Sequence, residues 1–269
     1  MQFYRGMDIG TAKLSLDERR GVAHHLIDNL AITDESTAAE YQLLARPLIQ
    51  ELQQRGVIPI LAGGSMLYIA SVLNDFEFPG TDPDLRAELE ARVEELGSVA
   101  LHRELAELDP VAASRVDALN PRRVVRAIEI VKITGKPFAA ALPETPVEWQ
   151  PSLQLGLNGE RAHLVARLAK RVEKMWQLGL VAEVQGLIDA GLREARTASR
   201  AIGYAQALAQ LDGQFSEAEA IAATTQLTQQ YSRRQMSWFR RDQRIQWLDF
   251  ESNRVAEDAI ALAERWLES

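Results

Sequence analysis

One stretch constrains the fold more than any other. The apolar run VIPILA (57–62) is followed by Gly63-Gly64-Ser65 and then by the helical pattern MLYIASVLND (66–75). A short apolar run bounded by turn residues is typical of a strand buried in a parallel sheet. Strand, glycine turn and helix make half of an α/β unit. The chain is therefore predicted to contain a parallel α/β core.

Further elements of this core flank the stretch on both sides. Residues 36–56 predict a helix, because Thr37 and Glu40 have the spacing of a capping box and Gly56 follows its end. Pro47 inside this helix predicts a kink or an earlier break. LQLGL (153–157) and RIQWLDF (244–250) predict two more strands, with helices between and behind them.

The middle of the chain has a different character. Residues 83–135 predict helices only, with breaks at Gly97, at 108–110 and at 119–121, and the Pro-rich stretch 135–152 predicts a linker. We therefore expect an α/β core of residues 1–80 and 150–269, interrupted by an all-helical insertion of residues 81–149. Few strands remain for a whole sheet, which leads us to expect further core material ahead of residue 1.

The composition excludes several kinds of site. The 269 residues include no cysteine, which excludes disulfides, thiolate catalysis and cysteine-based zinc sites. The four histidines are one adjacent pair and two singles, a poor metal-ligand set. No apolar run approaches the roughly 18 residues needed to span a membrane, and no secretory signal is visible. A cytoplasmic protein without a membrane partner is expected.

Charge is distributed unevenly. The net charge of −8 argues against nucleic acid as a partner, but two segments are basic. Residues 122–132 hold four basic residues and one acidic (4 − 1 = +3), and residues 233–244 hold five and one (5 − 1 = +4). Any contact with an RNA backbone is expected at these two segments.

Two features could bind an anion. The turn Gly63-Gly64-Ser65 offers backbone N–H groups and a hydroxyl at a helix start, although a plain tight turn with Ser65 as N-cap explains it equally well. Arg167 and Arg171 stand one helical turn apart and could clamp a pyrophosphate, although a solvated basic stripe is the commoner explanation. Asp8 and Thr11, near Gly10, fit either a phosphate-binding loop or a turn.

The basic segments carry the candidates for RNA contact. Arg122, Arg123 and Arg126 follow Pro121, a plausible first residue of a helix. The second segment mixes guanidiniums, which suit phosphates, with side chains that can stack on or bond to bases: Arg233, Arg234, Gln235, Trp238 and Arg240. At helical spacing, Trp238 and Phe239 are more often core residues.

A phosphate-binding loop of the G-x-x-x-x-G-K-[ST] type is absent from the sequence. The one Gly-Lys pair is Gly135-Lys136, and Ile130 and Pro137 stand where the pattern requires glycine and Ser or Thr.

Taken together, eight stretches resemble the bacterial tRNA dimethylallyltransferases, collinearly from residue 1 to about residue 250. They are MQFYRGMDIGTAK, HHLID, GGSMLY, DPVAASRV, NPRRVVRAIEI, RLAKRVEKM, SRAIGYAQA and RRQMSWFRRD followed by WLD. The resemblance implies a core similar to P-loop kinases, with a helical insertion that grips the tRNA anticodon stem-loop. It implies transfer of a dimethylallyl group from its pyrophosphate to N6 of the adenosine 3′ of the anticodon (position 37).

The resemblance also implies what would precede this chain. In the family, a G-P-T-x-x-G-K-[ST] loop lies upstream of the segment matched by RGMDIGTAK, and an aspartate proposed as general base stands two places before the Met of a D-[SA]-M-Q motif. Met1 and Gln2 match the end of that motif. We therefore expect an N-terminally incomplete core, from a start assigned at an internal Met or from truncation, and impaired activity of the chain alone.

The resemblance assigns roles residue by residue. Ser65, in place of a Thr in many relatives, would bond to the oxygen that bridges prenyl carbon and pyrophosphate, and Arg171 would be catalytic beside it. Thr11, Arg167 and Arg171 would bind the pyrophosphate. The residues implied in tRNA contact are Gln2, Arg86, Arg122, Arg123, Arg126, Arg233, Arg234, Gln235, Trp238 and Arg240.

Two departures from the family pattern stand out. Ala23 replaces a Pro, and Ala205 replaces an Arg or Lys and so removes one basic contact.

Mg²⁺ is implied as the cofactor, with no protein ligands assigned, and the family implies a monomer. Two other functions stay open on the sequence. One is a small-molecule kinase with a P-loop fold, which would need neither basic segment, and the other is a non-catalytic RNA-binding remnant.

Overall fold

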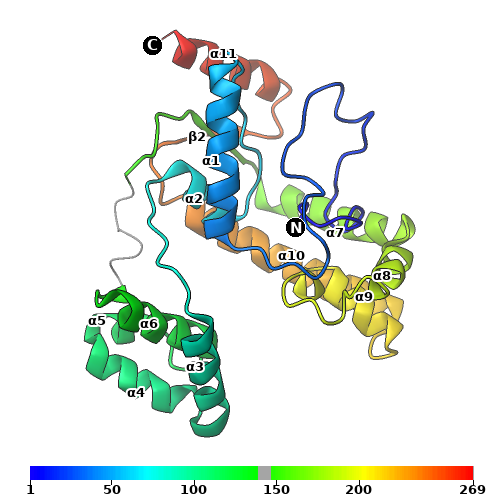
Figure 1. The fold of residues 1–269 in the computed structure, drawn as a ribbon. Coiled ribbons are helices and arrows are strands. Elements are labelled where there is room, and N and C mark those ends of the chain that lie inside the picture. The colour runs from blue at the N-terminus through cyan, green and yellow to red at the C-terminus, as the bar shows by residue number, and fades with distance from the viewer. Residues whose placement is uncertain (139–146, 269) are drawn as a thin grey trace. The chain divides into compact units, whose positions relative to one another are not determined.

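The computed structural model describes residues 1–138 and 147–268, and the chain divides into two compact units. The first unit consists of Met1–Ile69 and Ser152–Ser269, and the second of Ala70–Pro151 (Figure 1). The predicted insertion, residues 81–149, lies within the second unit. Residues 139–146 of the predicted linker lie outside the described residues.

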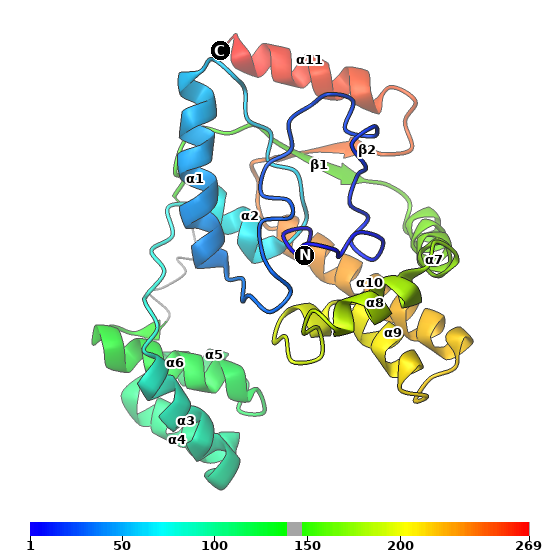
Figure 2. The same cartoon turned by 45° about the vertical axis from the view of Figure 1, so that its right-hand side comes forward.

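The first unit contains a small parallel sheet. Strands β1 (Gln154–Asn158) and β2 (Ile245–Asp249) pair in parallel, with Gly156 opposite Trp247 (Figure 2). A Cβ on Gly156 would lie 2.6 Å from the Trp247 ring, so glycine lets the indole lie against the neighbouring strand. Both predicted strands are confirmed, as is the α/β fold class with its helical insertion.

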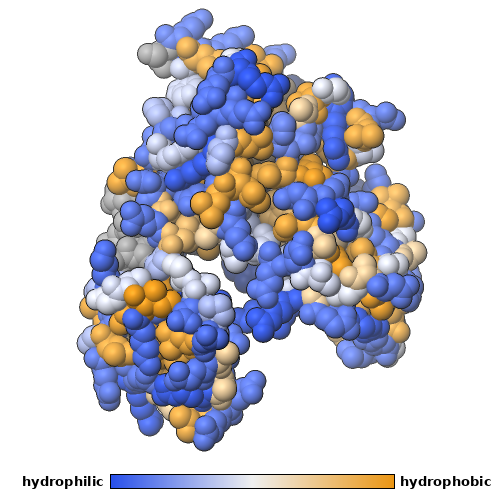
Figure 3. Space-filling model, viewed as in Figure 1, coloured by the Kyte–Doolittle hydropathy of each residue, from blue (hydrophilic) through white to orange (hydrophobic). Residues whose placement is uncertain are grey.

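The predicted strand at 57–62 is wrong. These residues adopt no strand conformation, and the side chain of Ile60 is 87% exposed. Figure 3 shows other hydrophobic residues at the surface of this unit among hydrophilic ones. A strand exists only where a neighbour accepts its backbone hydrogen bonds. No strand among the described residues pairs with 57–62.

Helices α1 and α2 bracket this segment. Helix α1 (Ala38–Gln54) begins at the predicted capping box, in which Thr37 and Glu40 satisfy each other's backbone N–H groups. The helix continues through Pro47 without a break. Helix α2 (Met66–Leu73) starts directly after Ser65, as the sequence predicts.

Further helices follow in the first unit, and all except the last contribute buried residues to its core. They are α7 (Arg161–Gln177), α8 (Leu180–Ile188), the short 3-10 helix η2 (Ala198–Arg200), α9 (Tyr204–Leu211), α10 (Glu217–Phe239) and α11 (Val255–Leu267). Trp176, Leu180 and Tyr204 are buried together with Tyr4 and Met7 of the N-terminal segment. The N-terminal segment therefore belongs to this core although it forms no helix there.

The second unit is a helical bundle with a core of its own. Its helices are α3 (Pro83–Leu96), α4 (Ser98–Leu108), α5 (Pro110–Arg115) and α6 (Pro121–Thr134). Asp109 and Asn120 cap α5 and α6 ahead of a proline at each first helical position. The predicted breaks are confirmed because these caps and Gly97, with φ of 79°, fall where the sequence places them.

A search of the described helices for one long and apolar enough to cross a membrane finds none.

Candidate active site

A pocket lies beside the sheet of the first unit. It has a volume of about 370 Å³ and is lined by residues from the strand ends, α7 and α10: Leu157, Asn158, Leu164, Arg167, Leu168, Arg171, Met236 and Phe250. The carboxyl ends of parallel strands are the usual binding edge of an α/β sheet. The lining is apolar except for Asn158 and the two arginines, so the pocket suits a ligand with an anionic head and an apolar tail.

Helix α7 places both predicted pyrophosphate arginines in this pocket. Its other side carries Val172 and Trp176, which are buried in the core. Because Arg167 and Arg171 are one turn apart, that burial turns both guanidiniums outward, where they are exposed. The guanidinium of Arg167 lies 4.7 Å from the centroid of the Phe250 ring, a cation–π contact.

The glycine turn before Ser65 is fixed from α10. The amide Nε2 of Gln235 donates to the Gly64 carbonyl oxygen at 2.7 Å. A Cβ on Gly64 would lie 2.3 Å from that nitrogen, so a larger residue at position 64 would make the Gln235 side chain shift. Ser65 itself is exposed at the start of α2, and its carbonyl accepts from Ile69 N at 2.9 Å.

Helix α10 therefore contributes both to the glycine turn and to the pocket. Gln235 holds the turn, and its neighbour Met236 lines the pocket. The sequence predicts tRNA contact for Gln235 and gives no signal for its bond to Gly64, because the two residues are 171 positions apart.

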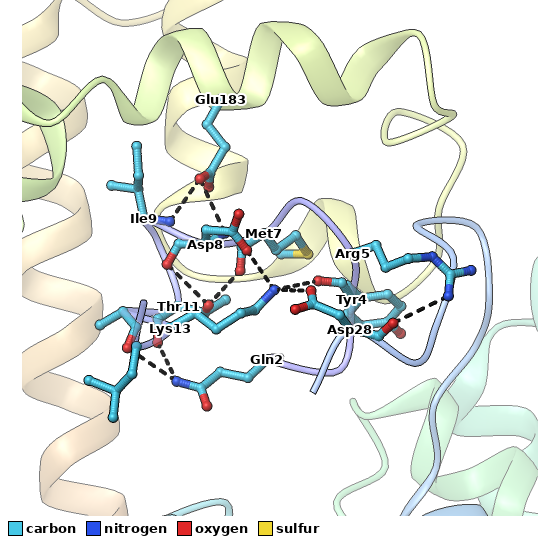
Figure 4. A network of polar contacts seen from close by, with 12 residues as sticks. Gln2, Tyr4, Arg5, Met7, Asp8, Ile9, Thr11, Lys13, Asp28 and Glu183 are labelled. Carbon is cyan, nitrogen blue, oxygen red and sulfur yellow. Dashed lines mark hydrogen bonds and ion pairs between the residues drawn. The ribbon is translucent and has the colours of Figure 1, made fainter. Parts of the chain in front are cut away.

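The N-terminal segment is organised around Lys13 (Figure 4). The Lys13 side chain is 4% exposed, and its Nζ donates to Asp8 Oδ1 at 2.6 Å, Asp28 Oδ1 at 2.5 Å and the Tyr4 carbonyl at 2.9 Å. These three acceptors use all three protons of the ammonium group. Asp28 has a φ of 58°, a left-handed conformation that this bond helps to hold.

A second anchor of the same segment comes from α8. Glu183 Oε2 accepts from the backbone N–H groups of Asp8 at 3.1 Å and Ile9 at 2.7 Å (Figure 4), and Glu183 Oε1 accepts from Tyr204 Oη at 2.5 Å. Burial, reinforced by this carboxylate, raises the pKa of Tyr204 far above its ordinary value. The phenol therefore stays protonated and remains a donor. Lys13 and Glu183 were both missed as functional candidates from the sequence.

Gln2 and Thr11 meet within this segment. Gln2 Nε2 donates to the carbonyl oxygens of Thr11 at 3.1 Å and Ala12 at 3.3 Å, and Thr11 Oγ1 donates to the Met7 carbonyl at 2.5 Å. Both side chains thus stabilise the loop in this structure. The predicted roles of Gln2 toward RNA and of Thr11 toward pyrophosphate stay predictions.

In the second unit the predicted arginines fall into two groups. Arg86 Nη2 and Arg126 Nη1 bond to Glu129 Oε2 at 2.5 and 2.8 Å, and Arg126 also donates to the carbonyls of Pro79 and Gly80. Arg122 and Arg123 are exposed at the start of α6. The Glu129 side chain is fully buried, and no sequence pattern indicates its role.

Burial would raise the pKa of the Glu129 carboxyl. The bonds from Arg86, Arg126 and the Asp82 N–H outweigh that effect and hold the pKa below its usual value.

The second basic segment is largely exposed. Arg233, Arg234 and Arg240 are exposed on and just after α10, and the guanidinium of Arg234 lies 5.8 Å from the Tyr231 ring centroid. Trp238 is 39% exposed, so it is not the core residue that helical spacing would favour. The segment can thus present both charge and an aromatic surface.

A second cavity of about 480 Å³ lies at the ends of β1 and β2. Its lining is Asn158, Gly159, Glu160, Trp247, Leu248, Asp249 and Glu251. The Glu251 carboxylate bonds to His163 and raises the pKa of that imidazole. The lining is acidic, so an anionic ligand suits it less than it suits the pocket with the two arginines.

Within residues 1–138 and 147–268, no three His, Cys, Asp or Glu side chains come together as a metal site.

Comparisons with known proteins identify the family of this chain. The chain matches the family model described as IPP transferase over residues 2–242. The tRNA dimethylallyltransferase of Thermobifida fusca (strain YX) is 50% identical over 97% of this chain and 82% of its own length, and that of Clavibacter sepedonicus is 53% identical over 97% and 84%.

Solved structures are similar as well. A full-length tRNA isopentenylpyrophosphate transferase from Bacillus halodurans is 37% identical with a TM-score of 0.68, over 99% of this chain and 86% of that one. A eukaryotic dimethylallyltransferase acting on tRNA has a TM-score of 0.85, over 100% and 71%, and at 24% identity it shows the fold alone. By the family match and relatives at 50–53% identity, this chain belongs to the IPP transferase family, a family of prenyl-transferring enzymes.

Proposed function

We propose that this chain transfers a dimethylallyl group from dimethylallyl pyrophosphate to N6 of adenosine 37 of tRNA, in the cytoplasm and as a monomer, with impaired activity when the phosphate-loop segment is absent. The observation that carries the proposal is the pocket in which Arg167 and Arg171 face apolar walls. The matching names of the curated relatives support the same reaction.

The pocket suits the two ends of this donor. Its volume of about 370 Å³ lies within the 300–1,000 Å³ that small-molecule sites usually have. Leu164, Leu168 and Met236 offer apolar contacts to the prenyl chain, and the guanidinium of Arg171 offers paired N–H donors to the pyrophosphate. Arg167, stacked on Phe250, supports the same charge.

The reaction is a substitution at the first prenyl carbon. The lone pair of adenine N6 forms the new C–N bond while the C–O bond breaks, and the electron pair of that bond leaves with the pyrophosphate. Arg171 stabilises the charge that develops on the leaving group, and the Ser65 hydroxyl donates to its bridging oxygen. The N6 proton passes to a carboxylate that acts as general base. None of the carboxylates in the described residues is proposed for this role.

RNA is proposed to bind through the two basic segments. Arg122 and Arg123 of α6 and the exposed arginines 233, 234 and 240 contact phosphates, and Trp238 stacks on an unpaired base. Gln2 and Gln235 lie near the target base. Arg86 and Arg126 contact RNA with the guanidinium N–H groups that are not bonded to Glu129 or, for Arg126, to the Pro79 and Gly80 carbonyls, since each guanidinium has five.

Mg²⁺ would accompany the pyrophosphate as an ion bound to the substrate. No protein ligand to the ion is proposed, and no step of the proposed reaction depends on one.

The test is a transfer assay with two forms of the protein. One is this chain, and the other, called the extended form, carries at its start the G-P-T-x-x-G-K-[ST] segment that the resemblance implies. Each is incubated with dimethylallyl pyrophosphate, Mg²⁺ and an anticodon stem-loop RNA, and the nucleosides are analysed by mass spectrometry. Prenylated adenosine at position 37 from either form supports the proposal. Stem-loop binding without product from either form favours a non-catalytic RNA-binding protein, and ATP-dependent phosphorylation of a small molecule without RNA binding favours a kinase.

A further inference from the structure

We infer that Glu183 is a positioning residue for the RNA side of the site: it fixes the loop 8–12 and, through that loop, the amide of Gln2. This inference rests on the proposed function, because it gives the loop a role in RNA binding. Neither the family match nor the sequence motifs assign a role to Glu183.

The geometry makes Glu183 the central acceptor of this region. Its two carboxylate oxygens receive three donors, which are the N–H groups of Asp8 and Ile9 and the hydroxyl of Tyr204. An ionised carboxylate can only accept, so its chemistry matches this set of donors. The Asp8 and Ile9 bonds connect residues 175 and 174 positions apart, and they tie the loop to α8.

The loop passes this constraint on to Gln2. Two of its carbonyls, those of Thr11 and Ala12, accept from Gln2 Nε2. Ala12 has a φ of 51°, an unfavourable conformation for alanine that only surrounding contacts can maintain. Fixing one end of this loop therefore fixes the direction of the Gln2 amide.

Tyr204 closes the loop from the other side. A Cβ on Gly10 would lie 2.4 Å from the Tyr204 ring, so the backbone of Gly10 lies directly against that ring. The hydroxyl of the same side chain bonds to Glu183. Loop, carboxylate and phenol thus form one packed unit, of which Figure 4 shows the loop and the carboxylate.

The effect of losing the carboxylate should be local. Helix α8 is anchored independently, because Leu180, Val184 and Leu187 are buried in the core. The loop 8–12 contains no helix or strand and is held by side-chain hydrogen bonds such as those to Glu183. When the carboxylate is lost, we therefore expect this loop to open while α8 stays in place.

The experiment compares Glu183→Ala, Glu183→Gln and Tyr204→Phe with Glu173→Ala, which removes an exposed carboxylate from α7. Three quantities are measured on this chain: affinity for an anticodon stem-loop RNA, hydrogen exchange of residues 2–13, and the melting temperature. For Glu183→Ala we expect stem-loop affinity to fall about tenfold, equal to about 1.4 kcal/mol, with faster exchange in residues 2–13. Glu183→Gln keeps an acceptor oxygen of nearly the same shape and should stay within about threefold of the wild type. Tyr204→Phe should lie between them, and Glu173→Ala should match the wild type.

The outcomes separate this inference from the proposed function. A wild-type chain that does not bind the stem-loop contradicts the proposed function, and the exchange of residues 2–13 then still tests whether Glu183 fixes the loop. A wild type that binds, with Glu183→Ala binding equally well, overturns the inference. The inference is also wrong if exchange in residues 2–13 is unchanged, or if Glu183→Ala lowers affinity only in proportion to general unfolding of α8 and α9.

Discussion

The side-chain amide of Gln235 and the carbonyl oxygen of Gly64 are joined by a hydrogen bond of 2.7 Å. This bond holds the turn that carries Ser65 against α10. Met236, the residue after Gln235 in that helix, lines the pocket that contains Arg167 and Arg171, which we call the arginine pocket. The two predicted anion-binding features of the first unit are thereby connected through one helix.

Replacing Gln235 tests this connection. In the extended form, Gln235→Leu removes the donor and leaves the partly buried Gly64 carbonyl unpaired, so we expect kcat/KM for dimethylallyl pyrophosphate to fall about tenfold, as the loss of about 1–1.5 kcal/mol predicts. Affinity for the stem-loop should change less than threefold. Steady-state kinetics and RNA titration measure the two effects, and Gln226→Leu, an exposed position on the same helix, is the matched control. A larger loss in RNA affinity than in prenyl-pyrophosphate use would instead support the tRNA contact that the sequence predicts for Gln235.

Arg171 should act on the pyrophosphate rather than on RNA. In the extended form, Arg171→Ala should lower kcat/KM for dimethylallyl pyrophosphate by about a hundredfold or more, because charge-assisted bonds to a developing anion are worth about 3 kcal/mol. Stem-loop affinity should be nearly unchanged. Lys170→Ala changes an exposed cation next to it in sequence and outside the pocket lining, and should leave both quantities at wild-type levels. The role of Arg171 is wrong if its variant loses RNA affinity more than prenyl-pyrophosphate use.

Local signals in the sequence predicted much of the fold. The capping box at Thr37 and the helix breaks at Gly97, at 108–110 and at 119–121 all depend on a few neighbouring residues, so they appear both in the sequence and in the structure. The prediction of a strand at 57–62 is wrong for the opposite reason. Its apolar pattern is local, but strand formation needs a hydrogen-bonded partner that sequence pattern does not supply.

In the candidate site, too, local features could be predicted from the sequence and long-range contacts could not. Arg167 and Arg171 could be placed together because helical spacing is a local property, and the structure puts both in one pocket. The anchors of the N-terminal segment could not be found from the sequence. Glu183 lies on another helix, and Lys13 reaches Asp28 across a chain of turns with left-handed residues. Such contacts depend on the packed core, which no spacing rule describes.

Lys13 should contribute to stability through the ion pairs of its buried ammonium group with two partly exposed carboxylates. Lys13→Met keeps much of the side-chain volume but leaves Asp8, Asp28 and the Tyr4 carbonyl without this donor. We expect a loss of about 1–3 kcal/mol in the free energy of unfolding, less than for a fully buried pair because both carboxylates remain partly exposed. Urea denaturation followed by circular dichroism measures it, with Lys170→Met as an exposed control. A change below about 0.5 kcal/mol, as at an ordinary surface position, would show that these pairs do not stabilise the segment.

Glu129 should make the second unit sensitive to acid. Its carboxyl has a lower pKa in the folded than in the unfolded chain, so the stabilisation is fully present above its usual value of 4.5 and is lost as pH falls through the folded-state value. The stability difference between wild type and Glu129→Gln should therefore shrink as pH falls below about 4.5. Hydrogen exchange of the α6 amides between pH 7 and pH 3.5 measures this difference. Glu90→Gln, at an exposed position of α3, should show no such trend, and a difference that stays constant with pH for Glu129→Gln would contradict the prediction.

The most direct test of the central claim is where the prenyl donor binds. The extended form is crystallised with an unreactive thio-analogue of dimethylallyl pyrophosphate and with a stem-loop RNA. We predict pyrophosphate density within hydrogen-bond distance of Arg171, with the prenyl chain against Leu164, Leu168 and Met236. Density for the analogue in the cavity lined by Glu160, Asp249 and Glu251, with the arginine pocket empty, would contradict this assignment of the site.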